Sequence, residues 1–129
     1  MLFRSNLESV HPDLQTLFFE IIKYRDCSVV AGLRTLEEQQ ELYAQGRTAP
    51  GEIVTNCDGV NRRSYHQSGN AVDVIPYPEK WDEEALRDFG NYVLGIAQML
   101  KKYGAIDSEI EWGGNWSSFP DKPHYQIKL

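Results

Sequence analysis

The sequence has little cysteine and no long apolar run. Its two cysteines, Cys27 and Cys57, are too few and too widely spaced for a disulfide scaffold or a Cys-type zinc motif, so we expect two reduced thiols in a core. No window approaches the roughly eighteen consecutive apolar residues of a membrane-spanning helix. The N-terminus also lacks the apolar stretch of a signal peptide. These absences predict a protein made in the cytoplasm, without stable membrane association.

Positive charge is also scarce. Thirteen Lys and Arg stand against nineteen Asp and Glu, which gives a net charge of -6. Binding to the phosphate backbone therefore has no global electrostatic support, and nucleic acid is not an expected partner. The length of 129 residues, with 41% apolar and 25% charged residues, is typical of one globular domain with one core. We expect a single domain over residues 1–129.

Local patterns predict alternating helices and strands. Pro12 opens an apolar stripe at helical spacing, with His11 in the turn before it. Thr35 and Glu38 form a capping-box pattern for a helix to about Gln45, and Asp82 is the expected N-cap of the longest helix. Predicted strands cover residues 28–33, 52–56, 71–75, 110–112 and 124–127. This order predicts an α+β fold with helices packed on a small, mostly antiparallel sheet.

An acidic residue, Asp73, lies inside one of these apolar strands. A buried carboxylate costs several kcal/mol unless it is compensated, so a positive group should meet it. Arg62 or Arg63 could be that partner. A metal ion is the alternative, because His66 lies seven residues earlier across a glycine-containing turn. These residues alone leave both interpretations open.

A second segment favours the metal. His124, one of only three histidines, begins the last predicted strand and can supply a third ligand beside His66 and Asp73. Two imidazoles and a carboxylate leave one position open for water, as in catalytic zinc sites. Asp121, three residues earlier, is either a turn residue or the general base that activates this water. Glu111 is the rival base, although it precedes a bulky tryptophan in a strand whose side chains alternate between faces.

These motifs together resemble a known family. The motifs that carry this resemblance are Ser64, His66 and Asp73, the Trp-Gly-Gly of residues 112–114, and Asp121-x-x-His124. With these motifs the chain resembles the LAS-type zinc peptidases, the group of D-alanyl-D-alanine carboxypeptidases. The Val-His-Pro-Asp-Leu of residues 10–14 and the Arg-Thr-x-x-x-Gln of residues 34–39 look most like bacteriophage L-alanyl-D-glutamate endopeptidases, which are endolysins.

The resemblance implies roles for individual residues. The implied ligands of one zinc ion (Zn2+) per chain are His66, Asp73 and His124. Asp121 matches the residue that activates water and then protonates the leaving amine, and Arg34 matches the arginine that stabilises the oxyanion. Implied contacts to the substrate are Gln39, Ser64 and Trp112.

The implied function is hydrolysis of the L-alanyl-D-glutamate bond in the stem peptide of peptidoglycan, which lyses the bacterial wall. A monomer of LAS or Hedgehog-like fold, without a separate wall-binding domain, would remain in the host cytoplasm until its release to the wall. Two alternatives remain open. One is a D-alanyl-D-alanine carboxypeptidase or dipeptidase, and the other is a non-catalytic zinc-containing binding domain like the amino-terminal domain of Hedgehog proteins.

Overall fold

A four-stranded antiparallel sheet in the order β1-β2-β4-β3 forms the centre of the computed structural model, which describes residues 6–129. The strands are β1 (Cys27–Ala31), β2 (Ala71–Pro76), β3 (Ile110–Trp112) and β4 (His124–Ile127). The helices are α2 (Pro12–Ile22), α3 (Leu36–Ala44) and α4 (Glu83–Lys102), with short 3-10 turns η1 (Tyr65–Ser68) and η2 (Gly113–Asn115). The α+β fold is confirmed. Residues 1–5, on which the expected lack of a signal peptide partly depends, lie outside the described range.

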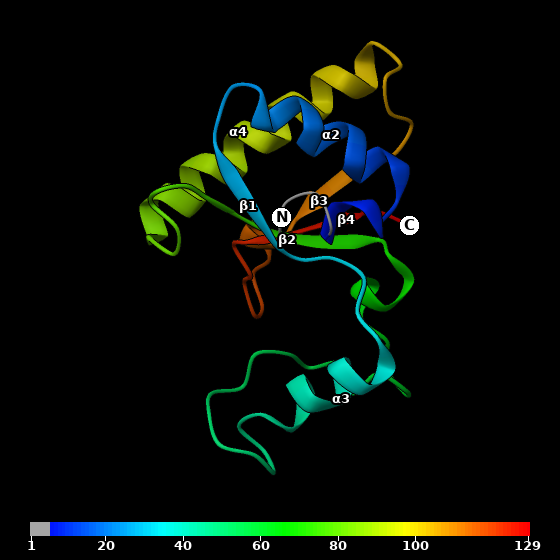
Figure 1. Ribbon diagram of the computed structural model, residues 1–129, viewed down its shortest axis with the longest axis vertical. Helices are drawn as coiled ribbons and strands as arrows, with labels where there is room; N and C mark the ends of the chain where they lie inside the picture. The colour runs from blue at the N-terminus through cyan, green and yellow to red at the C-terminus, as the bar shows by residue number, and fades with distance from the viewer. Residues whose placement is uncertain (1–5) are drawn as a thin grey trace.

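The helices begin where their capping residues predict. His11 caps α2, because its Nδ1 accepts a hydrogen bond of 2.9 Å from the backbone N–H of Asp13, which is the structural role expected for this histidine. Thr35 and Glu38 form the complete capping box of α3, and the Asp82 side chain caps α4. Helices α2 and α4 lie on one side of the sheet, and α3 lies on the other side (Figure 1).

The two faces of the sheet have different environments because side chains alternate along each strand. Val72 and Val74 of β2 and Tyr125 of β4 belong to the core cluster beneath α2 and α4, where Tyr125 contacts the ring of Phe18 edge-on. The alternate residues of β2 and β4 therefore point to the opposite face, toward α3. Asp73 is one of these residues, which explains how a carboxylate fits inside an otherwise apolar strand.

The strand predicted at residues 52–56 is wrong. In the described structure this segment is irregular, and Ile53 and Val54 are 47% and 44% exposed. Its backbone carbonyls accept hydrogen bonds from side chains and not from a neighbouring strand. Gln45 donates to the carbonyl of Glu52, and Arg47 donates to the carbonyl of Thr55. The β-branched residues indicated a strand locally, but no partner strand lies beside them in residues 6–129.

The cysteines occupy different environments. Both are free thiols, and Cys27 lies in the core, where burial and the charge of Asp26 raise its pKa to about 12. Cys57 is only half-buried, so the expectation of two core thiols holds for Cys27 alone.

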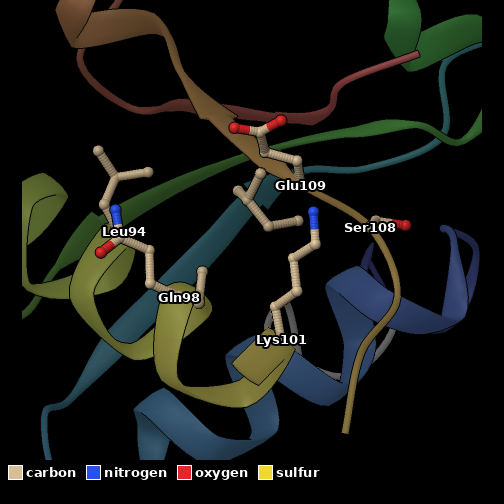
Figure 2. A pocket seen from close by; sticks show the side chains of 7 residues that line it. Leu94, Gln98, Lys101, Ser108 and Glu109 are labelled. Atoms are coloured by element: carbon tan, nitrogen blue, oxygen red, sulfur yellow. The ribbon is translucent and has the colours of Figure 1, made fainter. Parts of the chain in front are cut away.

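Two further properties bear on binding. A small hollow of about 60 Å³ lies between α4 and the segment entering β3, lined by Gln98, Lys101 and Glu109 among others (Figure 2). It is too small for a peptide. None of the helices described in residues 6–129 has the length and hydropathy of a membrane span.

Candidate active site

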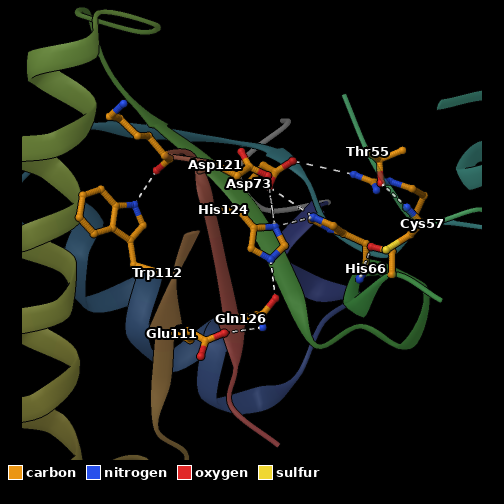
Figure 3. Close-up of polar contacts among 12 residues, drawn as sticks. Thr55, Cys57, His66, Asp73, Glu111, Trp112, Asp121, His124 and Gln126 are labelled. Atoms are coloured by element: carbon orange, nitrogen blue, oxygen red, sulfur yellow. Dashed lines mark hydrogen bonds and ion pairs between the residues drawn. The ribbon is translucent and has the colours of Figure 1, made fainter. Parts of the chain in front are cut away.

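Three elements bring His66, Asp73 and His124 together (Figure 3). Asp73 of β2 and His124 of β4 are directly paired across the sheet, so their side chains stand next to each other on the face toward α3. His66 lies in η1, which precedes β2. Gly69 ends η1 with a left-handed φ of 75°, a conformation that glycine adopts without strain, and thereby turns the chain into β2.

The distances within this cluster fit a metal ion. His66 Nε2 lies 3.2 Å from His124 Nδ1, and each of these nitrogens lies 3.3 Å from Asp73 Oδ1. Ligands bonded at about 2.0–2.1 Å to a tetrahedral ion are roughly 3.3 Å apart. All three pairs have this spacing, so the cluster matches three corners of a tetrahedral site and leaves the fourth corner open.

The outer nitrogens of the two imidazoles have fixed partners. His66 Nδ1 lies 2.9 Å from the carbonyl oxygen of Gly32, which can only accept, so the proton is on Nδ1 and the lone pair on Nε2. His124 Nε2 lies 2.7 Å from Gln126 Oε1, which likewise leaves the lone pair on Nδ1. Both lone pairs therefore point at each other and at Asp73. This donor set is chemically suited to a zinc-like cation.

The electrostatics of the cluster also favour a cation. Burial on its own would raise the pKa of Asp73, but the hydrogen bonds and charges of His124 and His66 outweigh it and hold this pKa well below its usual range. Burial would lower the pKa of His124, yet the hydrogen bond and charge of Asp73, with Gln126, raise it above the ordinary value. The cluster thus stabilises positive charge beside Asp73, which a proton on His124 supplies without a metal and which a bound cation would supply in place of that proton.

Arg34 lies on the other side of Asp73. Its Nη2 is 3.8 Å from Asp73 Oδ2, while its Nη1 donates a 2.8 Å hydrogen bond to Gln39 Oε1. Burial lowers the pKa of Arg34, and the charges of Asp73 and Asp121 partly oppose this effect. Within the described residues the ion-pair partners of Asp73 are Arg34 and the two histidines, whereas the sequence had suggested Arg62 or Arg63.

Gln39 differs from the expectation of a substrate contact. Its side chain is completely buried, and its Nε2 donates to the carbonyl oxygen of Cys57 at 2.8 Å while its Oε1 accepts from Arg34. A group without exposed surface cannot touch a substrate in this conformation. Gln39 instead links Arg34 to the irregular segment after α3.

Asp121 approaches the cluster from the loop before β4. Its Oδ2 lies 3.9 Å from His124 Nδ1. Burial, followed by the charge of Asp73, raises the pKa of Asp121, although His124, His66 and Arg34 offset part of this effect. A carboxylate with a raised pKa is a stronger base than an ordinary aspartate, and next to an open metal position it is suited to take a proton from water.

The backbone of this loop is held by residues around η2. Asp121 N–H donates to the carbonyl of Gly113 at 2.9 Å, and the indole N–H of Trp112 donates to the carbonyl of Lys122 at 2.7 Å. Trp112 is 3% exposed, and a Cβ on Gly90 would lie only 2.3 Å from its ring. Trp112 was expected at the substrate, but it fills the core beside α4 and holds the loop that carries Asp121.

Ser64 has one clear structural role. Its Oγ accepts a 3.2 Å hydrogen bond from the N–H of His66 and caps η1, while its own N–H is bound by Gln67. Ser64 also lines the open cleft, so a contact to substrate stays a prediction.

The cluster opens into a cleft of about 720 Å³, a volume within the range of ligand sites. Arg62 and Arg63 line this cleft, as do three aromatic residues that the sequence reasoning did not assign: Trp81, Trp116 and Phe119. The ring of Trp116 lies 5.1 Å from that of His124. Its position two residues after the Gly-Gly pair was a usable signal, whereas nothing near Trp81 in the sequence connects it with the metal site.

This geometry agrees with the comparison to known proteins. Residues 58–127 match the model of a peptidase M15 family described as D-alanyl-D-alanine carboxypeptidase. The match covers more than half of the chain and includes His66, Asp73, Asp121 and His124. The chain belongs to this peptidase family.

Individual relatives narrow the comparison. Over 108 residues the chain is 35% identical to the peptidoglycan L-alanyl-D-glutamate endopeptidase CwlK of Bacillus subtilis (strain 168), covering 79% of this chain and 60% of CwlK. The chain thus spans less than two thirds of that relative. The Serratia marcescens L-Ala D-Glu endopeptidase ChiX superposes with a TM-score of 0.69 at 26% identity, over 98% of this chain and 86% of ChiX. The vancomycin resistance D,D-pentapeptidase VanY, solved in complex with Zn(II), shares the fold with a TM-score of 0.52 at 19% identity, over 90% of this chain and 68% of VanY.

Proposed function

We propose that the chain is a zinc-dependent endopeptidase that hydrolyses the bond between L-alanine and D-glutamate in the stem peptide of peptidoglycan. The observation that carries this proposal is the spacing of 3.2–3.3 Å among the ligand atoms of His66, Asp73 and His124, at the base of an open cleft. The names of CwlK and ChiX supply the choice of bond, since both are L-alanyl-D-glutamate endopeptidases.

The residues around the cluster have complementary tasks. Zinc held by the three ligands would supply Lewis acidity, which makes water a better nucleophile near neutral pH. Asp121 takes the proton from the attacking water and delivers it to the departing amide nitrogen. Arg34, held by Gln39, neutralises the negative charge that develops on the carbonyl oxygen of the scissile bond. No covalent bond to the protein is required.

The charge of the cleft suits an acidic peptide better than the charge of the whole chain does. The net charge is -6, yet Arg34, Arg62 and Arg63 all line the cleft. These arginines supply local positive potential for the carboxylates of the stem peptide, and charges inside a cleft act more strongly than a net charge spread over the surface.

A second activity is favoured by the family match, whose description is D-alanyl-D-alanine carboxypeptidase. Digestion of purified muropeptides, followed by mass spectrometry of the fragments, separates the possibilities. The endopeptidase releases a peptide with a new N-terminal D-glutamate, whereas a carboxypeptidase releases free D-alanine. Protein that binds zinc and yields neither product would be a non-catalytic binding domain, an outcome that the presence of both Asp121 and Arg34 argues against.

Replacement of the proposed base tests the mechanism. We expect Asp121→Ala to retain bound zinc and to lose at least about 100-fold in activity, because general base catalysis contributes roughly 10²–10⁴-fold. His66→Ala should lose zinc as well as activity. The matched control is Glu79→Ala, which removes an exposed carboxylate outside the cleft and should change neither. Full activity of the Asp121 variant would reject Asp121 as the base.

The proposed biological setting is lysis of a bacterial host by a bacteriophage. The enzyme would accumulate as a monomer in the host cytoplasm and reach the wall after another protein opens the membrane. Support comes from the resemblance of residues 10–14 and 34–39 to endolysins. Expression in a Gram-negative host should cause lysis only when the inner membrane is permeabilised, and the Asp121→Ala variant should not lyse the cells. Lysis without permeabilisation would contradict the proposed localisation.

A further inference from the structure

A row of polar side chains continues from the metal cluster across the sheet. Glu111 of β3 is paired in register with Gln126 of β4, and Gln126 lies two residues after His124 on the same strand. Side chains two residues apart point to the same face, and so do directly paired ones. Glu111, Gln126, His124 and Asp73 therefore follow one another along the face toward α3 (Figure 3).

Hydrogen bonds connect the members of this row. Gln126 Nε2 lies 2.8 Å from Glu111 Oε1, and Gln126 Oε1 lies 2.7 Å from His124 Nε2. Gln126 is 8% exposed, so water has little access to compete for its amide. On the other side of the ring, His124 Nδ1 faces Asp73 and His66.

The chemistry of Glu111 determines which group donates and which accepts in each hydrogen bond along the row. An ionised carboxylate accepts hydrogen bonds and cannot donate one, so Glu111 requires the NH2 group of Gln126 on its side. The amide oxygen of Gln126 must then face His124 and accept a hydrogen bond from Nε2–H. Neutral imidazole has only one N–H, so Nδ1 is left with the lone pair that a metal needs.

We propose that Glu111 and Gln126 are positioning residues that hold His124 in the Nε2–H tautomer, with Nδ1 ready to bind the metal. This inference rests on the proposed zinc site and adds its outer support. It also gives Glu111 a role other than base: it is bound to Gln126, which separates it from His124, and it does not line the cleft. Partners of this kind typically contribute 10- to 100-fold to metal affinity or activity.

The hydrogen bonds in the row have one fixed direction because Glu111 can only accept, so substitutions that reverse this direction test the proposal. In Glu111→Gln the residue at position 111 can donate as well as accept, so the Gln126 amide can reverse and present its NH2 group to His124. The tautomer with the proton on Nδ1 then becomes favourable, and a metal must displace that proton. In the double variant E111Q/Q126E the carboxylate moves next to His124. It accepts from Nε2 and restores the required tautomer.

The test measures the zinc dissociation constant of purified apo protein by competition with a chelating dye. We expect Glu111→Gln to weaken zinc binding about tenfold or more. The double variant should recover most of the affinity. Glu109→Gln is the matched control, because Glu109 is an exposed glutamate next to β3 whose ion-pair partner among the described residues is Lys128. The zinc affinity of this variant should equal that of the wild type.

Nitrogen NMR of the apo protein provides a readout independent of metal. The sequence has three histidines, so the His124 ring is readily assigned. Spectra recorded at a pH above the raised pKa of His124, where the ring is neutral, should show the wild-type proton on Nε2. Glu111→Gln should shift this population toward Nδ1–H. Unchanged zinc affinity and an unchanged tautomer in Glu111→Gln would overturn the inference, as would failure of the double variant to recover affinity.

The same experiments distinguish this inference from the proposed function. If muropeptides are not cut but zinc affinity follows the expected order, the peptidase proposal fails and the positioning role stands. If muropeptides are cut and the variants bind zinc like the wild type, the positioning role fails and the peptidase proposal stands.

Discussion

Gly113 offers a sensitive test of how the loop carrying Asp121 is placed. A Cβ at this position would lie 2.3 Å from the carbonyl oxygen of Asp121, and 3.1 Å from the Cβ atoms of Asp121 and His124. The φ of Gly113 is not positive, so alanine has no backbone penalty there and the close approach alone decides the effect. We predict that Gly113→Ala displaces Asp121 while the rest of the domain still folds.

The size of the effect follows from these distances. Non-bonded carbon and oxygen atoms need more than about 3 Å, so the loop must move by roughly 0.7–1 Å. A misplacement of about 1 Å at a reacting group can cost on the order of 100-fold in rate. The contact with His124 should weaken zinc binding as well, so activity must be measured at saturating zinc. Overpacking of this kind typically lowers the free energy of unfolding by about 1–3 kcal/mol.

The matched control is Gly95→Ala. Gly95 is exposed in α4, and a Cβ there would have no atom within 4 Å. This change should leave activity unaltered and stabilise the helix by about 0.5–1 kcal/mol. The assays are kcat/KM on purified muropeptides, zinc affinity and urea unfolding. Wild-type kcat/KM in Gly113→Ala would refute the argument that this packing contact positions Asp121.

Three other predictions concern stability. The Asp13 carboxylate accepts hydrogen bonds from Ser108 N and Oγ at 2.9 and 2.6 Å, and although burial would raise its pKa, these bonds lower it below 3.8. The ionised Asp13 carboxylate therefore stabilises the folded state above pH 3.8, and this stabilisation is lost as the pH falls through the lowered pKa. Asp13→Ala should lower the free energy of unfolding by about 1–2 kcal/mol in urea near pH 7, and by less under acid conditions. Equal losses at both pH values would contradict this. The buried hydroxyl of Tyr125 has no hydrogen-bond partner among residues 6–129, so Tyr125→Phe should raise the free energy of unfolding by about 1 kcal/mol, and a loss would reveal a hidden partner. Chelation should lower Tm and added zinc should restore it, because a ligand at 100 times its Kd stabilises the folded state by about 2.7 kcal/mol. An unchanged Tm would argue against the metal site.

Local sequence patterns predicted most of the regular structure. Pro12, the capping box of Thr35 and the cap at Asp82 each mark an observed helix start, because these residues satisfy backbone groups close to them in sequence. The segment 52–56 failed for the opposite reason. A strand needs a neighbouring strand to hydrogen-bond with, and in this segment the side chains of Gln45 and Arg47 donate hydrogen bonds to the backbone carbonyls instead.

The candidate site was predictable in its residue types and only partly in its geometry. Scarce histidines and a carboxylate in an apolar strand led to His66, Asp73 and His124. The family resemblance predicts Gln39 and Trp112 at the substrate, but both are buried and contact neighbouring protein groups. Gln39 accepts a hydrogen bond from Arg34, and Trp112 donates one to the loop that carries Asp121. A residue motif specifies which side chains are present, whereas burial depends on what packs against them.

The fold class, the helix starts and the residues available as metal ligands follow from the amino-acid sequence alone, since each depends on local spacing and residue chemistry. The pairing of Asp73 with His124, 51 residues away, and the hydrogen bond between Glu111 and Gln126 become visible only in the folded chain. Those contacts depend on the register between strands that are distant in the chain. A shift of one residue would turn these side chains to the other face of the sheet, so the site exists only in the register that also buries the core.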